Sequence, residues 1–362
     1  MIKFAINGFG RIGRSAFRVW LLRFQPELDL VAINTSGSMP VSSWAHLAKY
    51  DTAYGPIFTE LNFREIKSPD QATDQDPLIG YLTIGSKDIP ILAQRDPAKI
   101  PWSKYQADVI IESTGAFRTQ AEASKHLTAG AKIVIISAPA KGGGMPTALI
   151  GVNEEVITHP KDRTNTVTVL SNASCTTNSV APVAAIMHAK LGIKKAMLNT
   201  IHGYTDDQNL QDNSHKDLRR ARAAALNIVP TSTGAAQATT ETIPELKGLF
   251  DGIALRVPII TGSITDFTFI TEKTTSVEEV NQIFIDATHS PLYQNILAVT
   301  SEPLVSSDII GRPESAIVDL SLTRVVDGDL VKVLAWYDNE WGYANRLVEQ
   351  VQLASESLIQ SS

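Results

Sequence analysis

The chain has 362 residues, with 32 Lys and Arg against 38 Asp and Glu, so its formal charge is −6. Hydrophobic residues make up 43% of the chain, which excludes wholesale disorder, and a prior of roughly 150 residues per domain predicts two domains. The mild acidity argues against a nucleic-acid binder or a protein of anionic membranes, and no apolar run reaches the roughly 18 residues of a membrane helix. The opening residues MIKFAIN begin a strand pattern rather than a signal peptide, so we expect a cytoplasmic protein.

The first half of the chain alternates short apolar strands with helical stretches. Ile2–Ile6 alternates and ends at a glycine loop, and the apolar spacing predicts a helix over Ser15–Phe24. Further strands are predicted at Leu28–Ile33, Val109–Glu112, Ile133–Ser137 and Val167–Leu170. Strands that alternate with helices predict an α/β domain with a doubly wound parallel sheet of the Rossmann type.

The second half carries longer β-rich segments with longer connections, which predicts an α+β domain with a mixed or antiparallel sheet. Its predicted strands are Ala196–His202, Gly252–Val257, Ile264–Ile270, Ala316–Leu322 and Leu330–Trp336. The last segment, Trp341–Leu358, is apolar at helical spacing, and we expect it to pack back on the first domain. The predicted domains are therefore residues 1–173 with the C-terminal helix 340–362, and residues 174–339.

The first predicted strand leads into Gly8-Phe9-Gly10-Arg11-Ile12-Gly13, which fits G-x-G-x-x-G. The motif follows a strand and opens a helix, which is the context in which it binds a dinucleotide. Gly8 permits a tight turn, Gly10 lets a pyrophosphate approach the backbone, and Gly13 lets helix and strand pack closely. The helix N-terminus offers N–H groups to the phosphates, and the alternative is a glycine turn without a ligand.

The second predicted strand ends in Asn34-Thr35-Ser36-Gly37-Ser38, which contains no acidic residue. An NAD site usually places a carboxylate there to bind the adenosine ribose. A carboxylate would repel the 2′-phosphate of NADP, whereas the hydroxyls of this turn would not. No Lys or Arg lies in the turn either, so the sequence permits NADP without selecting it.

The only thiol of the chain is Cys175, which excludes an internal disulfide and a thiolate metal cluster, and we expect no metal site. Cys175 lies in the polar run SNASCTTN, directly before a predicted helix over Val180–Lys190. A helix N-terminus would lower the pKa of the thiol. Because a structural cysteine would have apolar neighbours, this setting favours a nucleophile over a structural role.

A nucleophilic thiol needs a base, and His202 is the best placed of the seven histidines. It ends a predicted strand and follows Cys175 by 202 − 175 = 27 positions, which leaves room for a helix and a returning strand. That arrangement could bring the two side chains within hydrogen-bond reach. Spacing alone leaves a capping or surface histidine as the alternative.

Two later stretches and one strand arginine suit an anion. His215–Arg222 is a basic cluster, and Pro230–Ala236 offers hydroxyls, a glycine and backbone amides before a helix. Guanidinium groups and such a loop together suit phosphate. Arg256 lies inside a predicted strand, where a charge usually needs a partner. Salt bridges or subunit contacts are the alternative for Arg219 and Arg222.

The chain resembles the phosphorylating glyceraldehyde-3-phosphate dehydrogenases over nearly its whole length. That family carries the same blocks in the same order: INGFGRIGR, SNASCTTN, HGYT, LRRARAAA, NIVPTSTGAA, LRVP and WYDNEWGYANR. The resemblance implies that Cys175 is the nucleophile and His202 its base.

The resemblance also implies two sets of binding residues. The substrate phosphate and inorganic phosphate would be held by Ser174, Thr176, Thr205, Arg220, Thr233, Gly234 and Arg256. The cofactor would contact Gly8, Gly10, Arg11, Ile12, Gly13, Asn34, Thr35, Arg95, Ser137, Asn339 and Tyr343. Within the cofactor set, Asn339 would hold the nicotinamide carboxamide and Tyr343 would pack near that ring.

The activity implied is the reversible oxidation and phosphorylation of glyceraldehyde 3-phosphate to 1,3-bisphosphoglycerate, with NAD or NADP, in glycolysis or gluconeogenesis. A homotetramer is implied, with residues 203–228 at a subunit interface. The alternatives are erythrose-4-phosphate dehydrogenase, whose thioester is hydrolysed, and a nucleotide-binding protein without catalysis.

Three features depart from the family pattern. Thr35 stands where members that use NAD have aspartate. Polar extensions are expected at Phe63–Gln75 and around Thr158–Thr166, and both are interpreted as surface loops rather than new sites.

Overall fold

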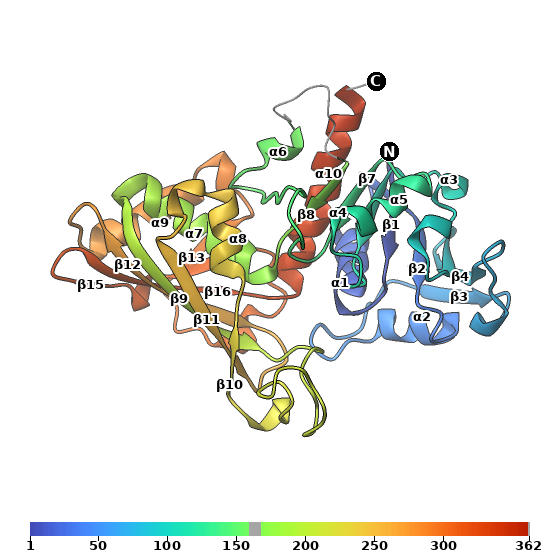
Figure 1. Ribbon diagram of the computed structural model, residues 1–362, viewed down its shortest axis with the longest axis horizontal. Coiled ribbons are helices and arrows are strands. Elements are labelled where there is room, and N and C mark those ends of the chain that lie inside the picture. Colours follow the sequence, from blue (N-terminus) through green and yellow to red (C-terminus); the bar gives the residue numbers. More distant parts are fainter. Residues whose placement is uncertain (159–167, 361–362) are drawn as a thin grey trace. The chain divides into compact units, whose positions relative to one another are not determined.

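The computed structural model describes residues 1–158 and 168–360. The chain divides into two compact units (Figure 1). The first consists of Met1–Ala148, Glu154–Ala173 and Ala344–Ser362, and the second of Leu149–Asn153 and Ser174–Tyr343. The extension expected around Thr158–Thr166 falls on residues 159–167, outside the described residues.

The first unit is built on a sheet with the strand order β3-β4-β5-β2-β1-β6-β7-β8. Its strands are β1 (Ile2–Asn7), β2 (Leu28–Thr35), β3 (Leu61–Glu65), β4 (Leu78–Ile84), β5 (Lys87–Ala93), β6 (Val109–Glu112), β7 (Ile133–Ile136) and β8 (Val169–Ser171). The strands from β5 to β8 in this order are parallel, and β3 and β4 are antiparallel. The predicted Rossmann-type sheet is therefore confirmed.

Helices surround this sheet in the first unit. They are α1 (Arg11–Val19), α2 (Val41–Lys49), α3 (Trp102–Tyr105), α4 (Gln120–Ala123), α5 (Lys125–Thr128) and α6 (Glu155–Thr158). The helix predicted over Ser15–Phe24 begins earlier, at Arg11, because Gly10 is its N-terminal cap, and it continues as a π-helical turn, Trp20–Phe24. The glycine loop is therefore shorter than the sequence pattern indicated.

The antiparallel strands β3 and β4 were not predicted. In β3 only Leu61 is buried, so the strand lacks the apolar alternation that would reveal it. The expected surface loop at Phe63–Gln75 contains the end of β3 and a short 3₁₀ helix, Pro69–Gln71. The connection that follows it reaches β4 at Leu78.

The second unit contains a mixed sheet with the order β10-β11-β9-β12-β16-β14-β13, and β15 pairs with β16. Its strands are β9 (Ile193–Gly203), β10 (Val229–Ser232), β11 (Phe250–Val257), β12 (Ser263–Thr271), β13 (Leu297–Thr300), β14 (Ala316–Asp319), β15 (Arg324–Val326) and β16 (Leu330–Tyr337). β9 and β11 are parallel, whereas β12 is antiparallel to both β9 and β16. The predicted mixed sheet is confirmed.

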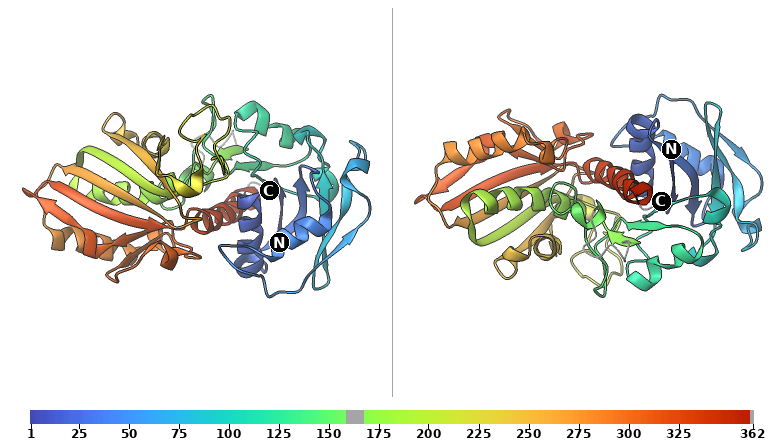
Figure 2. Two further views of the ribbon diagram at one scale, coloured as in Figure 1. Left: turned by 90° about the horizontal axis from the view of Figure 1, so that it is seen from below. Right: turned by 90° about the horizontal axis from the view of Figure 1, so that it is seen from above.

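Three helices cover one face of this sheet: α7 (Cys175–Leu191), α8 (Ala235–Thr242) and α9 (Val277–Thr288) (Figures 1 and 2). Along β12 every second residue is buried, as expected when one face of a strand is covered. Phe267 and Phe269 from β12 join Val280 and Phe284 from α9 in the core between helices and sheet. Val183 and Met187 of α7 belong to the same core, which fixes the position of the helix that carries Cys175.

The last helix, α10 (Trp341–Gln360), passes from the second unit into the first at Ala344. Leu347, Val348 and Val351 are fully buried. Gln350 Nε2 donates a hydrogen bond of 2.9 Å to the backbone oxygen of Ala148. Among the described residues, no helix is both long enough and apolar enough to span a membrane.

Replacing Phe284 by Ala tests the core of the second unit. Phe284 is fully buried, so truncation leaves a cavity, and we expect the free energy of unfolding to fall by about 3–5 kcal/mol. Denaturant unfolding measures the change. Glu278→Ala on the exposed side of the same helix is the control, expected to shift stability by less than about 0.5 kcal/mol. Equal effects of the two substitutions would contradict the described packing.

Candidate active site

Cys175 and His202 lie side by side in the second unit, 3.4 Å apart from Sγ to Nε2. Cys175 is the first residue of α7, and His202 is the next-to-last residue of β9. The separation of 27 positions spans the helix and the returning strand that the sequence predicted. Cys175 is half-buried and His202 is 3% exposed, so the capping or surface role for His202 is not what the structure shows.

The turn before α7 is fixed by backbone conformation and a side-chain cap. Ala173 has a φ of 51°, an uncommon left-handed conformation for a residue with a side chain. Ser174 is then extended, and its Oγ accepts a hydrogen bond of 3.1 Å from the N–H of Thr177. Because the first N–H groups of a helix have no partner within it, the turn places donors around the sulfur.

The charges of the pair are set by burial. Burial raises the pKa of the Cys175 thiol, and the nearby Arg256 offsets part of that rise. Burial and then Arg256 lower the pKa of His202 to about 3. The backbone N–H groups at the start of α7 lower the pKa of Cys175, as its position at the helix N-terminus predicted, but burial outweighs them and the net shift is upward. At neutral pH the site holds a thiol beside an uncharged imidazole.

Arg256 is positioned by strand register. Parallel pairing of β11 with β9 sets Arg256 beside His202, and β10 pairs Val229 with Arg256 on the other side. The Arg256 Nη1 lies 2.7 Å from His202 Nδ1 and donates to the Gly203 oxygen at 3.1 Å. His202 Nδ1 is also 2.7 Å from that oxygen, which leaves Nε2 directed at the sulfur. Sequence reasoning singled out Arg256 but not its contact with the base.

The basic cluster is partly paired with acids. Arg220 forms ion pairs with Asp207 and Asp217, and it lies near enough to Arg256 to lower the pKa of that guanidinium. Arg222 pairs with Asp212 at 2.6 Å, which is the salt bridge that the sequence left as an alternative.

Two threonines predicted to hold phosphate lie at the ends of strands. Thr205 follows β9 closely, and its backbone oxygen accepts from the N–H of Gln208 at 2.9 Å. Thr233 Oγ1 accepts from the N–H of Ala235, and Gly234 caps the N-terminus of α8. The backbone N–H groups that the sequence predicted for this loop are therefore at a helix start.

Tyr337 is a member of the site that sequence reasoning missed. Its hydroxyl is 3.0 Å from Thr176 Oγ1 and 2.8 Å from Thr200 Oγ1, and its ring meets that of His202 edge-on. Tyr337 is fully buried at the end of β16, and burial raises its pKa beyond any physiological value. The only sequence signal for this residue was its place in Trp336-Tyr337-Asp338, at the end of a predicted strand.

Asn339 is oriented by three donors. Its Oδ1 accepts from Ser263 Oγ at 2.9 Å and from Thr261 Oγ1 and Gly262 N at 3.2 Å each. The Nδ2 group is left to donate, as recognition of a carboxamide oxygen requires. Tyr343 is 5% exposed, and burial raises its pKa well above the ordinary value.

In the first unit the glycine motif adopts the shape that a dinucleotide needs. Gly8 has a φ of 95°, and a Cβ there would lie 2.7 Å from the Thr114 nitrogen. A Cβ on Gly13 would lie 2.0 Å from the Gly8 oxygen, so only glycine permits this packing. A Cβ on Gly10 would meet no protein atom within 4 Å, which leaves room for a phosphate. The loop therefore fits a pyrophosphate.

Several other residues predicted to contact the cofactor make bonds within the protein itself. Arg11, the first residue of α1, pairs with Asp51 at 2.5 Å, so its guanidinium is engaged within the fold. The backbone contacts of Arg11 and Ile12 with the cofactor stay predictions. Ser137 follows β7, and its backbone N–H donates to the backbone oxygen of Glu112. Thr35 Oγ1 donates to the Leu92 oxygen at 2.9 Å, so that hydroxyl serves the fold.

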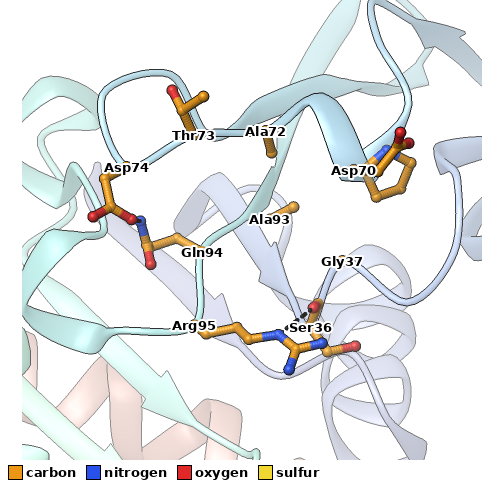
Figure 3. A pocket seen from close by; sticks show the side chains of 10 residues that line it. Ser36, Gly37, Asp70, Ala72, Thr73, Asp74, Ala93, Gln94 and Arg95 are labelled. Carbon is orange, nitrogen blue, oxygen red and sulfur yellow. Dashed lines mark hydrogen bonds between the residues drawn. The ribbon is translucent and has the colours of Figure 1, made fainter.

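A pocket of about 380 Å³ opens beside the end of β2 (Figure 3). Arg95 crosses it and donates to the Ser36 oxygen at 3.3 Å, while Gln94 and Asp74 line one side. The extension after β3 forms a wall through the stretch that contains Asp70. Because the pocket lies at the carboxyl end of β2, it is at the position where a Rossmann fold binds the adenosine ribose.

Known proteins match both units. The family model for the glyceraldehyde 3-phosphate dehydrogenase NAD binding domain matches residues 2–120, and that for the C-terminal domain matches residues 174–339, which include Cys175 and His202. The chain belongs to the glyceraldehyde-3-phosphate dehydrogenase family. The NAD binding domain match covers the glycine loop and the pocket beside β2, so both belong to a cofactor-binding domain of this family.

Full-length relatives agree with this assignment. "Glyceraldehyde-3-phosphate dehydrogenase 2" of Streptomyces arenae is 47% identical over 99% of both chains. A protein of the same name in Trichormus variabilis is 47% identical over 99% of this chain and all of its own. "Glyceraldehyde-3-phosphate dehydrogenase A, chloroplastic" of Chlamydomonas reinhardtii is 45% identical over 99% of this chain and 90% of its own.

The low pKa of His202 predicts a pH dependence of stability. The native ring resists protonation until about pH 3, whereas the unfolded ring takes a proton near its ordinary pKa of 6.5. Unfolding therefore takes up a proton between these values, and stability falls as pH falls. From pH 6.5 to 5 we expect the wild type to lose about 1.5 kcal/mol more than His202→Asn. Denaturant unfolding at both pH values measures this, and equal losses would contradict it.

Proposed function

We propose that this enzyme oxidises glyceraldehyde 3-phosphate to 1,3-bisphosphoglycerate through a thioester on Cys175. The observation that carries the proposal is the 3.4 Å contact between the only thiol of the chain and His202. The family membership and the fit of the glycine loop to a dinucleotide support it. The relatives named above carry this substrate in their names.

The first step is addition of sulfur to the aldehyde. His202 Nε2 takes the thiol proton as Sγ attacks the carbonyl carbon, so the neutral pair needs no prior ionisation. The N–H groups at the start of α7 stabilise the oxyanion of the thiohemiacetal, a contribution of about 3 kcal/mol. Ser174 maintains this arrangement by capping the helix.

The second step oxidises the thiohemiacetal. NAD(P), when bound, accepts the hydride at its nicotinamide ring. His202 first returns the thiol proton to the oxyanion, which gives the hydroxyl of the thiohemiacetal. The same nitrogen then accepts that hydroxyl proton as the hydride leaves, and a thioester on Cys175 remains. Asn339 would hold the nicotinamide by donating an Nδ2–H to the carboxamide oxygen, since Asn339 Oδ1 is already engaged by three donors.

The third step transfers the acyl group to inorganic phosphate. Thr205, Arg220, Arg256 and the turn at Thr233 and Gly234 supply the hydroxyl, guanidinium and N–H groups that two phosphates require. Inorganic phosphate attacks the thioester carbon, the sulfur leaves, and 1,3-bisphosphoglycerate is released. When a phosphate oxygen binds Arg256, the repulsion between Arg256 and a protonated His202 becomes weaker.

The alternatives fit the site less well. Erythrose-4-phosphate dehydrogenase would hydrolyse the thioester and would not need the phosphate loop at Thr233–Ala236. Turnover in the wild type with and without inorganic phosphate separates the two activities. A binding protein without catalysis would have no use for a nucleophile and base in contact.

The assembly and location remain part of the proposal. We propose a cytoplasmic protein that forms a homotetramer. The assembly fits the exposed apolar side chains of the segment 203–228, where Leu210, Leu218 and Leu226 are about 80% exposed. Mass measurement in solution tests the oligomer.

Cys175→Ser tests the nucleophile. Because serine cannot form the thioester under these conditions, we expect kcat to fall by more than about 10⁴-fold while NAD affinity stays unchanged. Steady-state kinetics and calorimetry provide the two values. Thr177→Ser, which retains a hydroxyl in the same helical turn, is the control. Turnover of Cys175→Ser near the wild-type rate would refute the assignment.

The pocket beside β2 predicts the use of both cofactors. The end of β2 carries no acid and Arg95 crosses the pocket, while of the two carboxylates in the pocket lining, Asp70 and Asp74, Asp74 is paired with Lys99. We therefore expect kcat/KM for NADP within about a hundredfold of that for NAD, a difference below about 2.7 kcal/mol. Ser36→Asp adds a carboxylate to the pocket and is expected to lower kcat/KM for NADP about tenfold while sparing NAD. A larger preference for NAD in the wild type, or no effect of Ser36→Asp on the ratio, would contradict this account.

A further inference from the structure

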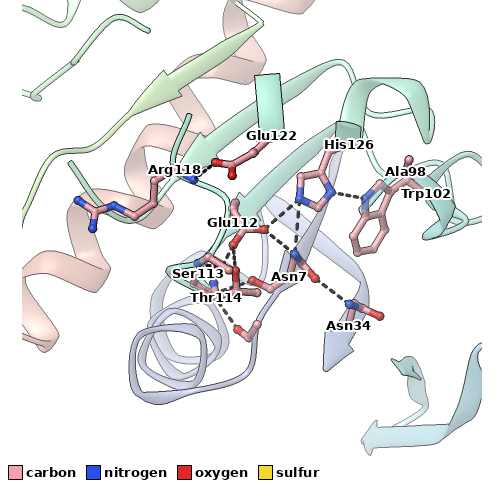
Figure 4. Close-up of polar contacts among 12 residues, drawn as sticks. Asn7, Asn34, Ala98, Trp102, Glu112, Ser113, Thr114, Arg118, Glu122 and His126 are labelled. Carbon is pink, nitrogen blue, oxygen red and sulfur yellow. Dashed lines mark hydrogen bonds and ion pairs between the residues drawn. The ribbon is translucent and has the colours of Figure 1, made fainter. Parts of the chain in front are cut away.

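A row of buried polar side chains crosses the carboxyl ends of three neighbouring strands of the first unit (Figure 4). Glu112 ends β6, Asn7 ends β1, and Asn34 lies next to the end of β2. The register pairs Asn7 with Glu112 on one side and with Asn34 on the other. All three are no more than 3% exposed, and the proposed chemistry uses neither Glu112 nor Asn7.

Glu112 is the acceptor on which this row converges. One of its oxygens accepts from Asn7 Nδ2 at 2.5 Å and from His126 Nε2 at 3.0 Å. The other accepts from the backbone N–H of Thr114 at 2.8 Å and from the Thr114 hydroxyl. A carboxyl group that accepts from four donors and donates to none is the ionised form. Its charge is removed from water but fully hydrogen-bonded.

Both ends of the row are locked. The Trp102 indole, which can only donate, gives its N–H to His126 Nδ1 at 2.9 Å, so the His126 proton must lie on Nε2. At the other end, Asn34 Oδ1 accepts from the Gln94 N–H at 3.0 Å, and Asn34 Nδ2 donates to the Gln94 oxygen at 2.8 Å. Asn34 Nδ2 also donates to Asn7 Oδ1 at 2.7 Å. Backbone groups cannot exchange donor and acceptor roles, so each amide has one orientation.

The same carboxylate holds the segment that packs on the glycine loop. Ser113 Oγ donates to the Gly8 oxygen at 2.7 Å, and the Ser113 N–H donates to the Asn7 oxygen at 2.7 Å. Thr114, fixed by two bonds to Glu112, lies so close that a Cβ on Gly8 would come within 2.7 Å of its nitrogen. The row thus connects Glu112 to the loop that fits the pyrophosphate.

The row also reaches the pocket beside β2. Gln94, whose backbone holds Asn34, lines that pocket and donates from Nε2 to Asp74 at 3.1 Å. Asp74 is held in turn by Lys99 at 2.5 Å. One continuous set of hydrogen bonds therefore runs from Trp102 to the pocket wall.

We propose that Glu112 is a positioning residue for dinucleotide binding. Its negative charge, and not only its volume, orients the Asn7 and Asn34 amides and holds Ser113 and Thr114 against Gly8. Loss of that charge disturbs the glycine loop and the pocket together. The inference rests on the proposed dehydrogenase function only through the cofactor, so binding can be measured without substrate.

Glu112→Gln tests the proposal because it keeps the volume and replaces one acceptor by a donor. Two of the four donors then face an N–H₂ group, and no single rotation removes the conflict because the row is locked at both ends. We expect the Kd for NAD, measured by calorimetry, to rise at least about tenfold, while kcat at saturating NAD stays within about twofold. Alkylation of Cys175 without cofactor is expected at the wild-type rate.

Val134→Ala is the matched control, because Val134 is fully buried in β7 of the same sheet and has no polar role. It is expected to lower stability and leave the Kd for NAD unchanged. A Kd for Glu112→Gln within about twofold of the wild type, in folded protein, would overturn the proposal. An equal rise of the Kd for NAD in Val134→Ala would also overturn it, because the effect would then come from a general loss of packing in the sheet.

A second variant covers the case in which Glu112→Gln does not fold. Thr114→Val removes one of the four donors and retains the charge, so the Kd for NAD is expected to rise about threefold. An unchanged Kd would overturn the proposal. Failure of the proposed function itself would look different, since the wild type would bind NAD without oxidising glyceraldehyde 3-phosphate.

Discussion

The proposed chemistry depends on the contact between the half-buried Cys175 and the buried His202. Burial raises the pKa of the thiol and lowers that of the imidazole, so the two groups meet uncharged at neutral pH. A neutral imidazole is a competent base, whereas a protonated one is not. Arg256 lowers the pKa of the imidazole further, because its charge lies against the ring, and it offsets part of the rise in the pKa of the thiol. In the proposed mechanism, proton transfer to His202 therefore accompanies the attack of the sulfur.

Both units use the same physical device to position polar groups. In the first, Asn7, Asn34 and Glu112 meet at the carboxyl ends of parallel strands. In the second, β9 and β11 are parallel neighbours, and His202 and Arg256 lie beside each other near their carboxyl ends. Parallel strands place their carboxyl ends at the same edge of the sheet, so residues far apart in sequence become neighbours there.

The sequence predicted those features that depend on local pattern. The glycine motif, the helix after Cys175 and the return to His202 each have a short-range signal, and the structure contains all three. Strand β3 was missed because its exposed residues do not alternate. The contact of Arg256 with His202 could not be predicted, since it follows from strand register across 54 residues.

The direction of the net pKa shift of Cys175 could not be predicted from the sequence either. A helix N-terminus lowers the pKa of a thiol, but the depth of burial is a tertiary property that local sequence does not reveal, and here it dominates. Tyr337 was missed for a related reason, because its partners Thr176 and Thr200 come from two other elements. Thr35 was expected at the cofactor, yet its hydroxyl is bonded within the sheet.

The central claim is that oxidation passes through an acyl group on Cys175. The most direct measurement mixes the enzyme with glyceraldehyde 3-phosphate and NAD in the absence of inorganic phosphate, and records reduced cofactor and protein mass together. The account predicts a burst of one reduced cofactor per chain, with one phosphoglyceryl group on the peptide that contains Cys175. Reduced cofactor formed without any acylated Cys175 at any time would contradict it.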